Sequence, residues 1–336
     1  MRILLRTLRE PWCLAVQRSS GPRPSFGHVS IRSNNGGWFR QLPTFQNDNA
    51  IDNLGAEKEA SVGQAETDRL IMAKLSANLS FLFQEMPLPE RFGAAARCGF
   101  SAVECNFIYD LPISDVRTLL DTSGMRLVLI NVGPGAQLGD LGVAIMPDRG
   151  PEAASEFRRA LDYAVALDVP AIHYLAGRRG PDVFVETANA VFLENLVRDA
   201  DLAAEAGVKL TLEPLNGRDR PDYHLLSIEH ALRLIDAAGR PNIGLQLDLF
   251  HAAIRGDDVS HAINVSAEHL AHVQIAGAPD RCEPDTNLPD QRAVFQQLDA
   301  LGYSGWIGCE YQPASDTITG LKWARDFLAI KEIING

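Results

Sequence analysis

From Lys74 onward, the apolar residues of the chain alternate between two kinds of spacing. Short apolar runs typical of buried strands are each followed by a segment in which apolar residues recur with helical periodicity. The pattern occurs eight times, and several helical segments end just before a glycine, such as Gly124 or Gly239. We expect strands near 75–80, 101–106, 126–131, 170–175, 208–213, 243–248, 270–275 and 305–310. We expect helices near 88–98, 112–123, 151–167, 185–206, 227–238, 258–266, 290–301 and 316–333.

Eight strand–helix pairs in about 260 residues predict an α/β protein whose parallel strands close into a (β/α)₈ barrel. The alternative, an open doubly wound sheet, usually has five or six strands and a glycine-rich phosphate turn after the first. No G-x-G-x-x-G occurs there. Residues 132–150 form a long Gly/Pro-rich loop after the third strand, and we interpret it as a candidate lid or binding loop.

The segment before the barrel has a different composition, which predicts two parts: an extension at 1–71 and a barrel at 72–336. Residues 1–47 contain seven arginines, several serines and a single acid, Glu10, as mitochondrial transit segments do. The alternative is a start codon assigned too far upstream, with Met72 as the true start. Residues 48–71 have the composition of a linker. We therefore expect a cytoplasmic protein, or a mitochondrial one if the transit segment is genuine.

Charge and cysteine content limit the partners that the barrel can have. Residues 72–336 hold 22 basic and 36 acidic side chains, and an acidic body repels nucleic acid and anionic lipid surfaces. No apolar run of about 18 residues is present, so we expect no membrane span. Five cysteines occur without a C-x-x-C pair, which fits a reducing compartment. We expect a small-molecule substrate and no nucleic acid or membrane partner; a homo-oligomer is compatible with the sequence.

Polar residues with oxygen ligands end four consecutive predicted strands: Glu213, Asp248, Gln274 and Glu310. The active sites of such barrels lie at the carboxyl ends of the strands. Each acid alone is as well explained by a helix cap or a solvent-facing position, but several acids converging at one rim require a positive partner. An all-oxygen set favours Mg²⁺, or Mn²⁺, over Zn²⁺.

Three histidines and one further acid lie near these strand ends. His251 follows the sixth strand on the loop side, where contact with a substrate is expected. His173 and His272 fit barrel-core histidines, and for His173 substrate contact is the alternative. Glu104, late in the second strand, either supports the metal ligands or contacts the substrate.

Six segments of the chain carry a further signal: LSANLSFLF (75–83), VFLENL (191–196), LEPLN (212–216), QLDLFHAAI (246–254), HVQIAGAPDRCEP (272–284) and GCEYQP (308–313). These segments resemble the hydroxypyruvate isomerase family, which lies within the larger group of xylose-isomerase-like barrels. The resemblance covers about residues 73–330.

The resemblance implies roles for individual residues of this chain. Glu213 and Glu310 would be the proton donor and acceptor, and with Asp248 and Gln274 they would ligate a divalent metal. His251 and Arg281 would hold the substrate. Related ketose epimerases have histidine where Gln274 stands, so the glutamine favours the isomerase branch.

The chain departs from the family pattern after Arg281. The family usually reads R-G-E-P followed by a G-E-[IL]-[ND] stretch, whereas this chain reads RCEP and then DTNLPDQ (285–291). Cys282 thus replaces a glycine, and the later acid is missing from its usual place. The departure bears on the choice of substrate more than on the type of reaction.

The resemblance implies isomerisation of hydroxypyruvate to and from 2-hydroxy-3-oxopropanoate through an enediol. A 2-oxotetronate isomerase or a ketose 3-epimerase would use the same chemistry on a longer substrate. A metal-dependent phosphodiesterase acting at abasic DNA is more remote, because it needs several zinc-binding histidines and a basic surface. A non-catalytic binding barrel would be expected to lose one of the two glutamates, and both Glu213 and Glu310 are present.

Overall fold

Residues 73–284 and 290–328 are described by the computed structural model and form a closed barrel of eight parallel strands. Each strand pairs with its neighbour in chain order, and the last pairs with the first. The (β/α)₈ prediction is therefore confirmed. The strands are β1 (Leu75–Asn78), β2 (Ala102–Cys105), β3 (Arg126–Asn131), β4 (Ala171–His173), β5 (Lys209–Leu212), β6 (Ile243–Asp248), β7 (Leu270–Ile275) and β8 (Ile307–Cys309).

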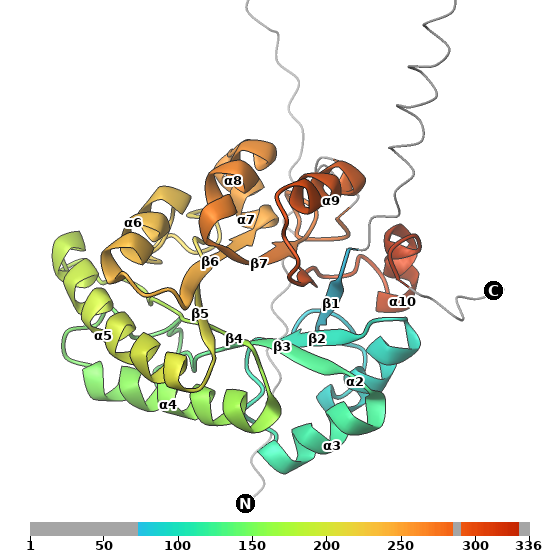
Figure 1. The fold of residues 1–336 in the computed structure, drawn as a ribbon, viewed down its shortest axis with the longest axis horizontal. Helices are drawn as coiled ribbons and strands as arrows, with labels where there is room; N and C mark the ends of the chain where they lie inside the picture. The colour runs from blue at the N-terminus through green and yellow to red at the C-terminus, as the bar shows by residue number, and fades with distance from the viewer. Residues whose placement is uncertain (1–72, 285–289, 329–336) are drawn as a thin grey trace, which may run out of the picture. The chain divides into compact units, whose positions relative to one another are not determined.

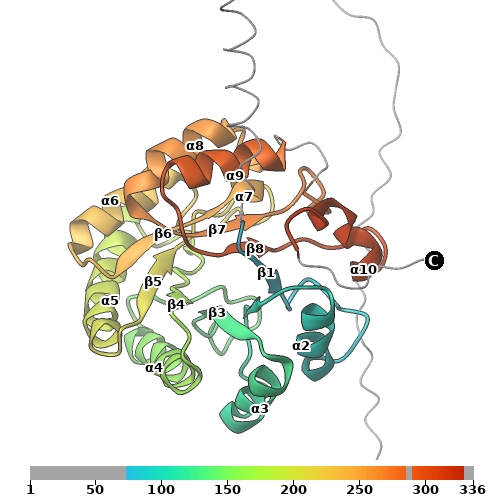
Figure 2. The same ribbon diagram turned by 45° about the vertical axis from the view of Figure 1, so that its right-hand side comes forward.

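Helices form a ring outside the strands, as Figures 1 and 2 show from two directions. They are α2 (Leu88–Arg97), α3 (Ile113–Ser123), α4 (Gly150–Leu167), α5 (Val185–Glu205), α6 (Ile228–Ala238), α7 (Leu249–Arg255), α8 (Val259–Ser266), α9 (Gln291–Ala300) and α10 (Thr317–Gly320), with 3₁₀ turns at Ala267–His269 and Leu321–Ala324. In the described part of the chain, no helix is both long and apolar enough to cross a membrane.

The helices differ from the predicted ones at two places. The first is α7, an additional helix that contacts β7 and α8. It begins directly after β6 because the side chain of Asp248 caps it, accepting a hydrogen bond of 2.8 Å from the backbone N–H of Phe250. In the described part of the helix predicted at 316–333, which ends at 328, the structure has α10 and a 3₁₀ turn instead.

The remaining predictions at the chain's ends and in one loop fall outside the described residues. These are the extension at 1–71 with its transit-like segment, positions 285–289 of the altered loop, and the end of the last predicted helix after 328.

The loop between β3 and α4 is tied together by ion pairs. The guanidinium of Arg149 lies 2.7 Å from both Asp140 and Glu152, and its side chain is only 12% exposed. Gly142 has a φ of +93°, and a Cβ added there would lie 2.4 Å from the carbonyl oxygen of Leu175, after β4. Glycine is thus required where the loop packs against its neighbour.

The interior of the barrel is polar near its carboxyl end. Such barrels are usually filled by branched apolar side chains, but here seven hydrogen-bonding side chains from five strands (β1, β2, β5, β6 and β7) are no more than 4% exposed. These residues are Ser76, Asn78, Glu104, Thr211, Gln246, His272 and Gln274. Because buried polar groups need partners, their hydrogen bonds fix where each side chain lies.

Candidate active site at the carboxyl ends of the strands

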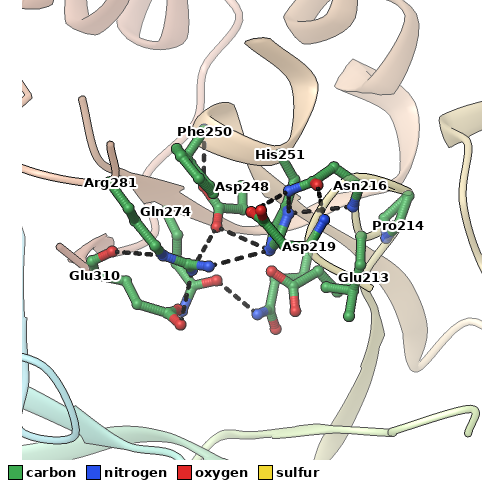
Figure 3. Close-up of polar contacts among 12 residues, drawn as sticks. Glu213, Pro214, Asn216, Asp219, Asp248, Phe250, His251, Gln274, Arg281 and Glu310 are labelled. Carbon is green, nitrogen blue, oxygen red and sulfur yellow. Dashed lines mark hydrogen bonds and ion pairs between the residues drawn. The ribbon is translucent and has the colours of Figure 1, made fainter. Parts of the chain in front are cut away.

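The four oxygen-bearing residues predicted from the strand ends lie at one end of the barrel (Figure 3). Asp248 and Gln274 are the paired ends of β6 and β7 in the sheet register. Glu213 and Glu310 each lie one residue beyond their strands, β5 and β8. All four side chains are buried.

The positive charge among these carboxylates comes from Arg281. Its Nη2 donates to Asp248 Oδ2 and to Glu310 Oε1, both at 2.9 Å. The guanidinium carbon lies 4.9 Å from the ring centre of Phe81 and 4.8 Å from that of Phe250. Since 19% of the Arg281 side chain remains exposed, the guanidinium is held in place yet accessible to an anion.

The backbone at Arg281 is in a conformation that few side chains adopt. Its φ is +55°, in the left-handed region, which costs a residue other than glycine about 1–2 kcal/mol. Residues held this way cluster at functional sites, where surrounding contacts compensate the strain. At Arg281 the compensating contacts are the two ion pairs.

Crowding raises the pKa values of the acids. Burial raises the pKa of Glu310 to about 8; Asp248 and Glu104 add to the rise, whereas Arg281 opposes it. Burial, Glu310 and Asp248 raise the pKa of Glu213 well above the usual glutamate value. Burial likewise raises the pKa of Asp248 against the opposing effect of Arg281. Two buried carboxyl groups with raised pKa values are suited to exchanging protons with a substrate.

His251 lies on α7, the helix that directly follows β6, and is 3% exposed. Its Nδ1 lies 2.7 Å from Asn216 Nδ2 and also accepts from the Asn216 backbone N–H at 3.2 Å. Burial and then Arg281 lower the pKa of His251 well below its usual value, so the ring is neutral. A neutral imidazole is the form that binds metals.

Three potential metal ligands converge in the described residues: atoms of Glu213, Asp248 and His251 lie within 4.8 Å of one another. Glu213 Oε1 is buried without a hydrogen-bond partner. The other two residues of the predicted set are engaged differently, because Gln274 Oε1 accepts from Gln246 Nε2 at 2.7 Å and Glu310 pairs with Arg281. An unpartnered oxygen beside other donors fits a bound cation.

His173, at the end of β4, points towards this cluster. Its Nδ1 lies 3.5 Å from Glu213 Oε2, and its buried Nε2 has no partner. Burial lowers its pKa to about 3, which leaves the ring neutral. His272 instead donates to Glu104 at 2.9 Å and is a core residue, as expected.

Two residues of the site were missed or left undecided by the sequence. The sequence signal for Gln246 is an amide two positions before Asp248 in an otherwise apolar strand. Asn216 lies within the segment LEPLN, and its bond to His251 depends on the fold.

A family model described as xylose isomerase-like TIM barrel matches residues 92–328. The 2-oxo-tetronate isomerase of Pectobacterium atrosepticum is 38% identical over 261 residues, covering 77% of this chain and 100% of that protein. The hydroxypyruvate isomerase of Escherichia coli is 34% identical over 253 residues, covering 75% and 98%.

Solved structures share the architecture. A Brucella melitensis protein described as AP endonuclease, family 2, is 36% identical, with a TM-score of 0.75 over 76% of this chain and 100% of that one. The D-psicose 3-epimerase of Clostridium cellulolyticum is 21% identical, with a TM-score of 0.62 over 76% and 91%, and shows the fold alone.

Proposed function

Because this chain belongs to the family of xylose isomerase-like TIM barrels, we propose that it is an isomerase that interconverts hydroxypyruvate and 2-hydroxy-3-oxopropanoate. Relatives that align over nearly their whole length are named hydroxypyruvate isomerase and 2-oxo-tetronate isomerase. Both names describe moving a carbonyl group between neighbouring carbons of a small hydroxy-oxo acid.

The observation that carries this proposal is the pair of buried glutamates on separate strands. Glu213 follows β5 and Glu310 follows β8, and burial raises the pKa of both. In the proposed reaction one carboxylate takes the proton from C3 of hydroxypyruvate, giving an enediolate with its negative charge on the C2 oxygen. The other carboxyl group then gives a proton to C2, and the hydroxyl proton of C3 passes to the C2 oxygen, which leaves the aldehyde at C3 and a hydroxyl at C2. Such positioned proton transfer contributes about 10²–10⁴-fold to a rate.

Arg281 is suited to hold the substrate carboxylate, since its guanidinium is fixed by two ion pairs and partly exposed. His251 Nε2 lies 3.3 Å from Arg281 Nη1 and would help to place the same end of the substrate. His173, whose Nδ1 lies 3.5 Å from Glu213 Oε2 and whose Nε2 has no partner, is suited to contact a substrate hydroxyl.

A divalent cation, with Mg²⁺ expected and Mn²⁺ as the alternative, would stabilise the negative charge that develops on the enediolate. The residues that would hold it are Glu213, Asp248, Gln274 and Glu310, and in the observed cluster His251 lies beside Glu213 and Asp248. Support for this comes from the unpartnered oxygen of Glu213.

The alternative with a specific observation behind it is a 2-oxo-tetronate substrate, because relatives with that name align over their full length. Its extra hydroxymethyl carbon would lie beyond C3 and leave the proton transfers unchanged. A phosphodiesterase acting at abasic DNA is less well supported, because the converging ligand cluster of the described residues contains one histidine and the whole chain has a net charge of −12.

The test is isomerisation in D₂O by the full-length chain, with hydroxypyruvate and 2-oxo-tetronate compared by kcat/KM. We expect deuterium to enter the carbon next to the carboxylate, and activity to be lost in EDTA and restored by Mg²⁺ or Mn²⁺. Glu213→Gln should lower kcat at least 100-fold.

Glu205→Gln, on the exposed end of α5, is the matched control and should retain full activity. Absence of exchange with both acids would refute the isomerase proposal. Full turnover by Glu213→Gln would refute the assignment of the proton-transfer residue. Cleavage of an abasic oligonucleotide by a chain inactive on both acids would favour the phosphodiesterase.

A further inference from the structure

Glu104 of β2 is a buried carboxylate to which the proposed reaction assigns no role; it is 1% exposed. Its Oε1 accepts from Asn78 Nδ2 at 3.0 Å and from Gln274 Nε2 at 2.8 Å. Its Oε2 accepts from Ser76 Oγ at 3.2 Å and from His272 Nε2 at 2.9 Å. Four donors fill the acceptor positions of the two oxygens. A carboxylate saturated in this way supports its neighbours rather than contacting a substrate.

The fold makes room for this carboxylate at Gly308 of β8. A Cβ added to Gly308 would lie 2.4 Å from Glu104 Oε1 and 2.5 Å from Oε2. Real Cβ atoms do not approach so closely, so glycine is needed at a position two residues before Glu310. The Glu104 side chain therefore reaches from β2 to bond with β1 and β7 and lies against β8.

The hydrogen bond between Glu104 and Gln274 determines which way the side-chain amide of Gln274 faces. An ionised carboxylate can only accept hydrogen bonds, so the NH₂ group of Gln274 must face Glu104. Its Oε1 then faces β6, where it accepts from Gln246 Nε2 at 2.7 Å. Gln246 Oε1 in turn accepts from Thr211 Oγ1 at 2.8 Å. The result is a directional chain of hydrogen bonds from β5 to β2 that ends on Glu104.

We propose that Glu104 is a positioning residue that sets the direction of this chain, so that Gln274 presents its oxygen, and not its NH₂ group, towards β6 and Asp248. Asp248 is the register partner of Gln274. The inference rests on the proposed function, in which the Gln274 oxygen is a metal ligand. A turned amide would present hydrogens to the cation, and partners of metal ligands typically contribute about 10–100-fold to metal affinity.

The first experiment measures Mn²⁺ binding to the full-length chain by titration calorimetry. Glu104→Gln keeps the size of the side chain but lets the Gln274 amide turn, and we expect Mn²⁺ affinity to fall about 10- to 100-fold. Ser76→Ala is the matched control because it removes a donor to the same carboxylate on the oxygen away from Gln274. It should stay within about threefold of the parent affinity, since the Gln274 bond is intact.

A double variant separates the direction of the chain from its charge. Glu104→Gln combined with Gln246→Glu keeps one acid in the network but places it on the other side of Gln274, which reverses the amide. We expect Mn²⁺ affinity to stay low. Parental affinity in the folded double variant would show that only the charge matters and would overturn the proposal.

Parental affinity in Glu104→Gln would also overturn it. If that variant does not fold, Glu104→Asp takes its place, since it keeps the charge but withdraws the carboxylate from Gln274; parental affinity there has the same meaning. A parent chain that binds no Mn²⁺ would refute the proposed function and this inference together. A parent that binds Mn²⁺ while the variants match it would refute this inference alone.

Discussion

Glu310 should make the folded protein less stable as the pH rises, because its carboxyl group is harder to ionise inside the barrel than in the unfolded chain. Burial raises its pKa from 4.5 to about 8. Because the pKa of Glu310 is higher in the folded chain than in the unfolded chain, its contribution to the free energy of unfolding is complete below pH 4.5 and is lost as the pH rises through 8. At about 1.36 kcal/mol per pH unit, the total loss over this interval is about 5 kcal/mol.

The perturbation is Glu310→Gln, which keeps the shape of the side chain and an oxygen that can accept from Arg281. Because glutamine does not titrate, this variant should lack that loss. We therefore expect Glu310→Gln to gain up to about 4 kcal/mol relative to the parent between pH 5 and pH 9, since only the part of the loss between pH 5 and about pH 8 falls in this range. The assay is urea unfolding in EDTA at five pH values, with Glu205→Gln as the control for loss of one exposed acid.

Parallel stability profiles for the parent and Glu310→Gln between pH 5 and pH 9 would refute the reasoning. So would a difference of the opposite sign. Added Mn²⁺ should act against the trend in the parent, because metal ligands must be deprotonated. Its stabilising effect is therefore expected to grow with pH.

Three further predictions concern the neighbours of this group. Arg281→Lys keeps the charge but loses the planar guanidinium, so KM for hydroxypyruvate should rise roughly 10- to 100-fold, the equivalent of one charge-assisted hydrogen bond. An unchanged KM in steady-state kinetics would show that Arg281 does not bind the substrate carboxylate. Gly308→Ala should lower the free energy of urea unfolding by about 1–3 kcal/mol by overpacking against Glu104, whereas Gly217→Ala, with no atom within 4 Å of the added Cβ, should be near neutral; equal effects would contradict the packing argument. Saturating Mn²⁺ at 100 times its Kd should stabilise the chain by about 2.7 kcal/mol, seen as a rise in Tm that is smaller in Asp248→Asn; an equal rise in both would remove Asp248 from the ligand set.

Local patterns in the sequence were sufficient to predict the barrel architecture. The apolar runs at 126–131, 243–248 and 270–275 match β3, β6 and β7 residue for residue. The other five strands are shorter than predicted, at the carboxyl end in β1 and at both ends in β2, β4, β5 and β8. Periodicity is set by neighbours along the chain, so it survives without knowledge of the fold.

The strand ends also identified the side chains that gather at one rim, because the carboxyl ends of parallel strands must meet there. What the sequence left undecided was how these residues pair. Asp248 both caps α7 and pairs with Arg281, and this double role turned a predicted loop into a helix that carries His251 into the site.

Glu104 shows most clearly what only the tertiary structure decided. Its pattern in the sequence allowed either a substrate contact or a supporting role, and its partners Gln274 and His272 lie 170 and 168 positions away along the chain. Closure of the barrel brings β7 and β8 beside β1 and β2, and Gly308 leaves the space that the carboxylate fills. Hydrogen bonds across a closed sheet depend on that closure, which no local spacing encodes.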